Sequence, residues 1–205
     1  NRGELCLIKK PRLLWACLFL LTILISSCSV ISGSSTSYNI TFGSCLNQLK
    51  KQPVWQSIIS MDPQAFIFLG DNVYSEVNRY SEYPKPERVA MAYQDLEDRK
   101  PYKAFKEASY QKAIKIFSVW DDNDYGENDA GREFAYRDQS KTLFLDFFEI
   151  PDNAPVRMRP GNYRAGELLL DHVRVQVLML DTRYFRSPLK YHPGQSACNN
   201  HLIEN

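Results

Sequence analysis

An acidic cluster directly behind a short apolar run is the feature that most restricts how this chain folds. The run covers residues 114–119, and residues 120–129 read Trp-Asp-Asp-Asn-Asp-Tyr-Gly-Glu-Asn-Asp. A short apolar run bounded by polar residues indicates a buried strand. Open α/β sheets form their ligand crevice just beyond the carboxyl ends of such strands. The cluster therefore predicts an α/β fold with a cation site, although by itself it also fits a solvated acidic turn.

Two further apolar runs end in polar residues in the same way. Residues 38–42 are followed by Gly-Ser-Cys45, and residues 65–69 by Gly-Asp71-Asn-Val-Tyr. A glycine lets the chain turn sharply at the strand end, so that the next aspartate can project into the crevice. Oxygen-rich ligand sets suit Ca²⁺, Mg²⁺ or Mn²⁺, and sets that include a thiolate can hold iron or zinc. Three strand ends together thus predict a metal site more strongly than any one of them.

The intervening segments read as helices and one hairpin around this site. Residues 53–59, 86–99 and 136–150 place their apolar side chains on one helical face, which indicates core helices. The first of them would connect two parallel strands as a βαβ crossover, and the Lys100-Pro101 step reads as a break. Residues 168–170 and 173–180 predict a hairpin with His172 in its turn.

Four motifs, in order along the chain, carry a resemblance to a known family. They are Phe-Gly-Ser-Cys-Leu-Asn-Gln, Phe-Leu-Gly-Asp-Asn-Val-Tyr, Trp-Asp-Asp-Asn-Asp-Tyr-Gly and Leu-Asp-Thr-Arg-Tyr-Phe-Arg. Together they resemble the alkaline phosphatase D (PhoD-like) branch of the calcineurin-like metallophosphoesterases, over roughly residues 38–190. The resemblance implies a four-layer α/β/β/α sandwich with its metal centre where strand ends of two facing sheets meet. It also implies hydrolysis of phosphate mono- or diesters by a metal-activated water.

The resemblance assigns a role to each residue that matches a motif. It implies two metal ions, Ca and/or Fe, with Mn or Zn as alternatives, and it places Asp71 as the carboxylate that bridges them. An arginine beyond a strand end could bind a phosphate through two guanidinium nitrogens. It could equally pair with Asp181 or another nearby acid. Both interpretations remain open for Arg183. The implied metal ligands are Cys45, Asp71, Asp121 and Asp122, the implied catalytic residues Asn123 and Asp124, and the implied substrate contacts Asn72, Tyr74 and Arg183.

Two departures from the family pattern affect the expected activity. Asn123 stands where the superfamily often has histidine, and an amide cannot donate a proton as an imidazolium does. The superfamily also completes its site with carboxyl-terminal histidines, whereas His172, His192 and His201 lie outside any such motif. We therefore expect that the carboxyl-terminal part of the domain is missing and that hydrolysis by this chain is impaired. The alternative is a non-catalytic surface lipoprotein fragment that binds a divalent cation.

The amino-terminal segment has the features of a secretory signal. Basic residues at positions 9, 10 and 12 precede an uncharged apolar run, residues 13–25, which is followed by Ser-Ser-Cys28. This order describes a signal peptide, and its end resembles a bacterial lipobox with Cys28 as the lipidated residue. The run is shorter than the roughly 20 apolar residues that a membrane-spanning helix needs, which disfavours an uncleaved anchor. We expect an extracytoplasmic, membrane-anchored bacterial lipoprotein of the periplasm or cell surface.

These observations predict four segments. They are a signal peptide over residues 1–27, a Ser-rich tether over 28–37, an incomplete PhoD-like domain over 38–190 and a polar tail over 191–205. The formal net charge of the whole chain is +1, and removal of the signal would leave a slight acidic excess, so there is no nucleic-acid-binding signature. Cys45 and Cys198 could pair in an oxidising compartment; we favour a free Cys45 that serves as a ligand.

Overall fold

The computed structural model describes residues 37–189. The predictions for the signal peptide, nearly all of the tether and the polar tail, including Cys28, His192 and His201, fall outside these residues. The chain divides into two compact units, residues 1–37 and 38–205, and all described helices and strands belong to the second. Within the described part of the chain, no helix has the length and apolar character needed to cross a membrane.

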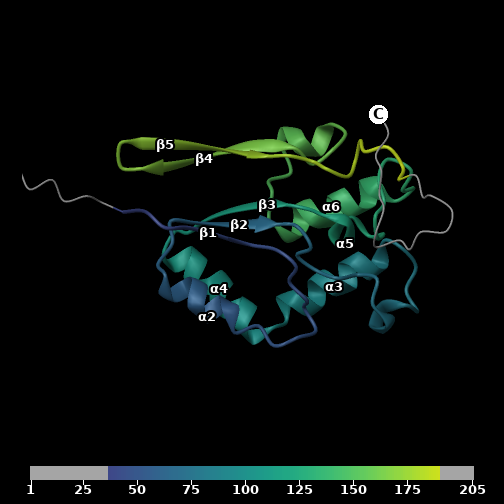
Figure 1. Ribbon diagram of the computed structural model, residues 1–205, viewed down its shortest axis with the longest axis horizontal. Coiled ribbons are helices and arrows are strands. Elements are labelled where there is room, and N and C mark those ends of the chain that lie inside the picture. The colour runs from purple at the N-terminus through teal and green to yellow at the C-terminus, as the bar shows by residue number, and fades with distance from the viewer. Residues whose placement is uncertain (1–36, 190–205) are drawn as a thin grey trace, which may run out of the picture. The chain divides into compact units, whose positions relative to one another are not determined.

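A three-stranded parallel sheet forms the centre of the second unit (Figure 1). Its strands are β1 (Ile40–Gly43), β2 (Ala65–Leu69) and β3 (Lys115–Val119), with β2 in the middle. Helix α2 (Val54–Ser60) connects β1 to β2, and the register of the two strands is parallel from Ile40 opposite Ala65 onward. The predicted βαβ crossover and the three predicted strands are therefore confirmed.

Helices cover one face of this sheet, below the strands in Figure 1. The helices predicted over residues 53–59, 86–99 and 136–150 are confirmed, but the break predicted at Lys100-Pro101 is only partly right. One helix ends at Glu97 and another begins at Lys100. Pro101 lies in the first turn of the second helix, where its missing N–H needs no partner. Besides α2, the helical elements are η1 (Asn78–Tyr80), α3 (Glu87–Glu97), α4 (Lys100–Gln111), α5 (Asp122–Tyr125), α6 (Arg137–Phe147) and η2 (Pro155–Met158).

The main core lies between the sheet and the helices and is rich in aromatic side chains. Strand β2 contributes Phe66 and Phe68, whose rings meet edge to face with centroids 4.7 Å apart. Trp55 of α2 stacks on Phe105 of α4 at 4.6 Å. Because successive strand residues face opposite sides, Ala65 and Ile67 of β2 face the other side of the sheet. Both faces of β2 are therefore apolar, as its uncharged sequence predicts.

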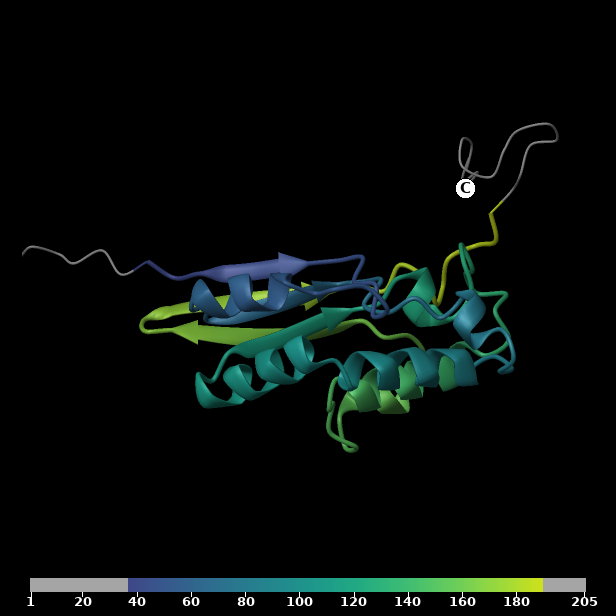
Figure 2. The same cartoon turned by 90° about the horizontal axis from the view of Figure 1, so that it is seen from below.

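A two-stranded antiparallel hairpin packs on the opposite face of the sheet, above the strands in Figure 1 and behind them in the view from below in Figure 2. It consists of β4 (Arg164–Leu170) and β5 (Val173–Met179), and its inner side chains form a second, smaller core with Ala65 and Phe117. The predicted hairpin is confirmed, and His172 lies in its turn. At that turn Asp171 accepts a hydrogen bond from the hydroxyl of Tyr38, just before β1. The turn thus lies at the amino-terminal end of the parallel strands.

The described residues establish a mixed α/β fold with a parallel sheet. They form a helical layer, the parallel sheet and the hairpin, which accounts for part of the expected four-layer α/β/β/α sandwich. The outer face of the hairpin leaves the side chains of Leu169, Leu178 and Leu180 largely exposed. The fourth layer remains an expectation from the family resemblance.

Candidate metal centre

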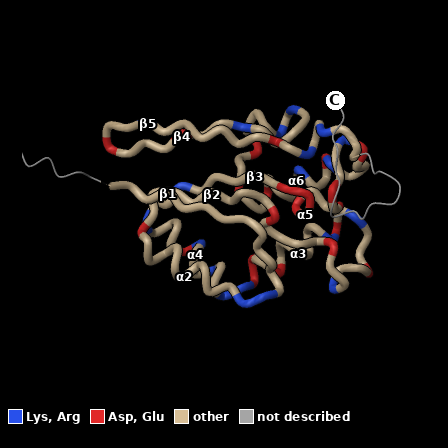
Figure 3. The backbone as a smooth tube through the Cα atoms, in the orientation of Figure 1, with Lys and Arg blue, Asp and Glu red and all other residues tan. Residues whose placement is uncertain are grey.

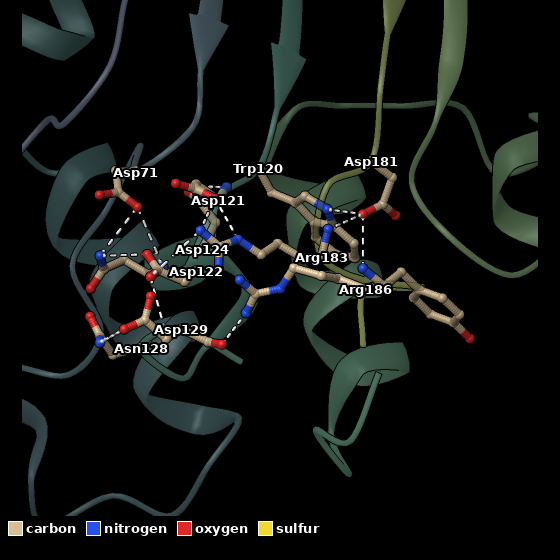
Figure 4. Close-up of polar contacts among 12 residues, drawn as sticks. Asp71, Trp120, Asp121, Asp122, Asp124, Asn128, Asp129, Asp181, Arg183 and Arg186 are labelled. Atoms are coloured by element: carbon tan, nitrogen blue, oxygen red, sulfur yellow. Dashed lines mark hydrogen bonds and ion pairs between the residues drawn. The ribbon is translucent and has the colours of Figure 1, made fainter. Parts of the chain in front are cut away.

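The loops after β2 and β3 bring three carboxylates together at the carboxyl end of the sheet (Figure 4). Asp71 follows β2, while Asp121 and Asp122 follow β3, and one oxygen atom of each lies within 4.8 Å of the others. Figure 3 shows acidic residues gathered where β3 leads into α5. Three of the four predicted metal ligands are therefore neighbours in space, although they come from two separate loops.

Gly70 lets these two loops approach each other. Its φ of +100° is one that side-chain-bearing residues rarely adopt, and a Cβ atom at this position would lie 2.8 Å from Cβ of Asp121. The next residue, Asp71, also has a positive φ, 50°, which aspartate tolerates better than most residues. The Gly-Asp sequence thus supplies the tight turn that places Asp71 beside Asp121.

Burial and mutual repulsion shape the electrostatics of the cluster. Burial raises the pKa of Asp71 above its ordinary value, and the charges of Asp122 and Asp121 raise it further. Hydrogen bonds from Asn123 act in the opposite direction and lower this pKa in part. The amide nitrogen Nδ2 of Asn123 donates to Asp71 Oδ1 at 3.2 Å and to Asp122 Oδ1 at 3.1 Å. Asn123, predicted to be catalytic, therefore holds two of the carboxylates at a fixed spacing.

The fourth predicted ligand, Cys45, is exposed and lies at the end of β1, outside the group of three carboxylates. Its backbone N–H donates to the carbonyl of Gly70 at 3.2 Å, which joins the loops after β1 and β2. Burial raises the pKa of the Tyr74 hydroxyl, with further contributions from its contacts with Cys45 and Asp71. Tyr74 thus lies close to both residues, and the ligand role of Cys45 stays a prediction.

Arg183 reaches the cluster from the segment after β5. Its Nε and Nη2 atoms both lie 2.5 Å from Asp121 Oδ1, and Nη2 lies 3.7 Å from Asp122 Oδ2. Of the two readings that the sequence left open, this geometry favours the pairing with a neighbouring acid. The Nη1 atom is buried without a hydrogen-bond partner, so the guanidinium retains donor capacity beside the carboxylates.

Asp124 and Asn72 link the two loops behind the cluster. Asp124 is fully buried and accepts hydrogen bonds from the backbone N–H groups of Asn72 and Asp121, each at 3.0 Å, and from the hydroxyl of Tyr93 at 3.0 Å. Burial raises the pKa of Asp124 to about 7. Asn72 is 1% exposed and donates from Nδ2 to the carbonyl of Val119 at 2.9 Å. Both contacts hold the loops in place; the catalytic role predicted for Asp124 and the substrate contact predicted for Asn72 stay predictions.

Asp181 connects the acidic motif to the hairpin, a role that the sequence reasoning missed. Its Oδ1 accepts hydrogen bonds from Trp120 Nε1 at 2.9 Å and from the backbone N–H groups of Arg183 at 2.9 Å and Tyr184 at 3.0 Å. Its Oδ2 accepts one from the N–H of Asn162 at 2.6 Å. An aspartate that bonds backbone groups two and three residues ahead is a known turn former, so its position after a strand was the available signal.

Asp129, the last residue of the acidic cluster, was not among the predicted ligands or catalytic residues. Its backbone N–H donates to Asp122 Oδ2 at 2.9 Å, and its carbonyl accepts a hydrogen bond from Arg186 (Figure 4). Asp122 therefore receives hydrogen bonds on both oxygens, from Asn123 and from Asp129. His172, the one histidine among the described residues, lies in the hairpin turn at the other end of the sheet and takes no part in the cluster.

No family model matches the chain, and no curated protein matches it. A search of solved structures finds a chain described as "Structure of PhoD", with a TM-score of 0.45 and 17% sequence identity over 73% of this chain and 32% of that chain. This chain thus spans about a third of the length of the matched structure.

Proposed function

We propose that this domain is a metal-dependent phosphoric ester hydrolase of the four-layer α/β/β/α type, acting on phosphate mono- or diesters. The observation that carries the proposal is the convergence of Asp71, Asp121 and Asp122 beyond the carboxyl ends of two parallel strands. The motif resemblance described above supports the reaction class. Substrate and metal sites in open α/β sheets lie at this edge.

The residues at this position fit a hard divalent cation. Three carboxylates lie within 4.8 Å of one another, and Arg183 is the cation that contacts them among the described residues. This leaves an excess of negative charge that Ca²⁺, Mn²⁺ or an iron ion would offset with oxygen ligands. Asp71 and Asp122 would hold the ion, and Asp121 would join them. A second ion, which the family resemblance implies, would use the thiolate of Cys45 and share Asp71.

A cation bound there would polarise the phosphoryl oxygens and lower the pKa of a water molecule. The chain's own residues would orient the ester. The free donor capacity of Arg183 suits a phosphate oxygen. The raised pKa of Tyr74 keeps its hydroxyl protonated and able to donate a hydrogen bond. Asn123 would keep Asp71 and Asp122 at the spacing that metal binding requires.

A second candidate function is cation binding without hydrolysis. The described cluster contains no imidazole, and Asp121 already pairs with Arg183, which reduces the ligands available to a second ion. This fits the alternative of a non-catalytic surface lipoprotein. Under either function we propose a bacterial lipoprotein that is anchored outside the cytoplasm through Cys28.

Two measurements on the same variants test the proposal. The first is metal content by mass spectrometry after dialysis against Ca²⁺ or Mn²⁺, for wild type, Asp71→Asn, Asp122→Asn and the control Asp98→Asn. Asp98 is exposed and pairs with Lys103 on the surface, so its variant should retain metal as wild type does. The two site variants should each lose most of the bound metal, because each replaces a charged ligand by a neutral amide of the same size.

The second measurement is hydrolysis of 4-nitrophenyl phosphate and its bis-ester with metal supplied. Activity that Asp71→Asn abolishes and Asp98→Asn preserves would support the hydrolase. Metal binding that depends on Asp71 and Asp122 without any hydrolysis would favour the cation-binding alternative. Equal metal content in wild type and both site variants would refute a metal centre at this position.

A further inference from the structure

A polar pocket lies between α6 and the segment that contains η2, apart from the carboxylate cluster. Its volume is about 390 Å³, and the basic side chains of Lys141, Arg157 and Arg159 line it. Among the described residues that line the pocket, Asp138 is the one acidic residue. None of the three clustered carboxylates belongs to it. The pocket is therefore a separate place with an excess of basic groups.

Lys141 is buried in this pocket without an acidic partner. It is 6% exposed, and a lysine is almost never buried to this degree unless it is paired. Within the described part of the chain it takes part in no ion pair, and its ammonium group donates to the carbonyl of Arg159. An ammonium group has three donor protons, so Lys141 retains unused donor capacity. The described fold thus places a desolvated positive charge in the pocket wall.

Arg159 also has unused donor capacity. Its Nη2 donates to the carbonyl of Tyr163, and its guanidinium carbon lies 3.7 Å from the centroid of the Tyr163 ring. These contacts hold the side chain in place, but its Nε atom is buried without a hydrogen-bond partner. Buried polar groups are normally hydrogen-bonded, and a donor that is not so bonded often marks a position where an ion or a water molecule binds.

The acidic residues closest to these cations already have other partners. Asp146 Oδ1 lies 2.7 Å from Arg157 Nη1, so these two charges offset each other. Asp138 Oδ1 accepts a hydrogen bond from the hydroxyl of Tyr184 at 2.7 Å. Over residues 37–189, no ion pair joins Asp138 to either of the two unpaired cations. The pocket therefore keeps two cationic groups that lack a counter-ion of their own.

We propose that this pocket binds a phosphate group, with Lys141 and Arg159 as its charged contacts. Ammonium and guanidinium groups are the side chains with which proteins bind phosphate. An anion between them would offset the cost of burying two unpaired positive charges. The site uses none of the proposed metal ligands, so it does not depend on the hydrolase function.

The remaining walls of the pocket leave two sources for the phosphate group. Leu145 and Met158 add apolar side chains to its lining, and the volume of about 390 Å³ has room for more than a phosphate ion. A small organic phosphate would place its apolar part against these two residues, whereas inorganic phosphate would use the charged wall alone. The two sources share the same charged contacts and are separated by the experiment below.

The test is a titration of the full 205-residue chain, freed of metal by a chelator, at constant ionic strength. The ligands are inorganic phosphate and phenylphosphonate, which has an apolar ring and no ester bond to hydrolyse. The shifts of backbone amide resonances in the NMR spectrum locate each ligand and give its dissociation constant. We expect saturable shifts over residues 138–145 and 157–160. Tighter binding of phenylphosphonate would assign the site to organic phosphates, and equal or weaker binding would assign it to inorganic phosphate.

The variants are Lys141→Met and the matched control Lys103→Met. Methionine keeps the apolar stem of lysine and removes the charge, and Lys103 is an exposed lysine that pairs with Asp98. Lys141→Met should raise the dissociation constant at least roughly tenfold, whereas Lys103→Met should bind as wild type does. If Lys141→Met does not fold, Arg159→Gln replaces it and should weaken binding in the same way.

Thermal unfolding separates a binding site from a lysine with a purely structural role. Phosphate should raise the melting temperature of wild type and Lys103→Met, because a ligand that binds the folded state stabilises it, but it should not stabilise Lys141→Met. Without phosphate, Lys141→Met should be at least as stable as wild type, since an apolar side chain replaces an unpaired buried charge.

Three results would overturn the proposal. The first is the absence of saturable shifts with either ligand. The second is a set of shifts over residues 70–72 and 121–124 in place of the pocket, which would assign the phosphate to the metal centre. The third is equal affinity in wild type and Lys141→Met, or in wild type and Arg159→Gln where that variant is used.

Discussion

The guanidinium of Arg183 contacts Oδ1 of Asp121 through both Nε and Nη2, each at 2.5 Å. The two residues are far apart in the sequence, and the pair joins the segment after β5 to the acidic loop after β3. Burial lowers the pKa of Arg183, but the hydrogen bond and the charge of Asp121 outweigh this, so its pKa is raised. The arginine thus acts as a counter-ion of the carboxylate cluster.

Substitution of this arginine should make the cluster more dependent on a metal ion. In Arg183→Gln the three carboxylates lose their counter-ion, and the free energy of unfolding without metal should fall by roughly 1–3 kcal/mol. Addition of Ca²⁺ or Mn²⁺ should then raise the melting temperature more than in wild type, because the ion no longer competes with the guanidinium for Asp121. Thermal unfolding with and without metal measures both effects.

The control for this prediction is Arg174→Gln, which removes an exposed arginine 3.8 Å from Glu167. A surface pair of this kind contributes little, so this variant should behave as wild type does. A metal-dependent stabilisation of Arg183→Gln no larger than that of wild type would contradict the counter-ion role.

Removal of the Asp181 carboxylate should loosen the acidic motif from the hairpin. Asp181→Ala leaves Trp120 Nε1 and the N–H groups of Asn162, Arg183 and Tyr184 without their acceptor. We expect a loss of about 2–4 kcal/mol in the free energy of unfolding, since several buried donors lose one charged partner. Urea unfolding, followed by tryptophan fluorescence, measures the loss. Asp152→Ala, at a fully exposed aspartate 3.8 Å from Arg157, should cost less than about 0.5 kcal/mol.

The carboxylate of Asp95 should contribute stability that depends on pH. It accepts hydrogen bonds from Arg79 Nε at 2.6 Å and from the hydroxyl of Tyr80 at 2.8 Å. Burial acts to raise its pKa, but these two partners outweigh burial and lower it below the ordinary value of 3.8. A lowered folded-state pKa means that the contribution is complete above pH 3.8 and is lost as pH falls through the folded-state value.

Asp95→Asn should therefore be less stable than wild type by roughly 0.5–1.5 kcal/mol at neutral pH. The difference should shrink below about pH 4, where the wild-type carboxyl becomes protonated as well. Urea unfolding at a series of pH values from 7 to 3 gives the profile. A difference that stays constant over that range would show that the hydrogen bonds do not depend on the charge.

The lipid anchor can be tested independently of the fold. Cys28→Ala should leave an unprocessed precursor or release an unlipidated form, because the residue that carries the lipid is gone. Membrane fractionation and electrophoretic migration in a bacterial host measure this, with Cys17→Ala as the control inside the apolar run. Identical behaviour of wild type and Cys28→Ala would count against a lipoprotein.

Local sequence determined the elements of this protein and the position of its candidate site. Short uncharged runs such as residues 65–69 predicted buried strands, and the Gly70-Asp71 turn directs a carboxylate beyond the strand end. Parallel strands end at one edge, so Asp71 and Asp122 could be expected to meet. Helix α4 was not predicted, because the Lys100-Pro101 step was interpreted as a break. Proline is in fact well tolerated in the first turn of a helix.

Only the tertiary structure decided which partners these side chains have. The pairing of Arg183 with Asp121 joins segments that are distant in the chain. The hydrogen bonds that Asp181 accepts from Trp120 and Asn162, and those that Asp124 accepts from Asn72 and Tyr93, do the same. Sequence spacing carries no signal for such contacts, because they depend on how the hairpin packs on the sheet. The sequence determines which residues reach the edge of the sheet, whereas the packing of the layers decides which of them are hydrogen-bonded in place and which remain free to bind a ligand.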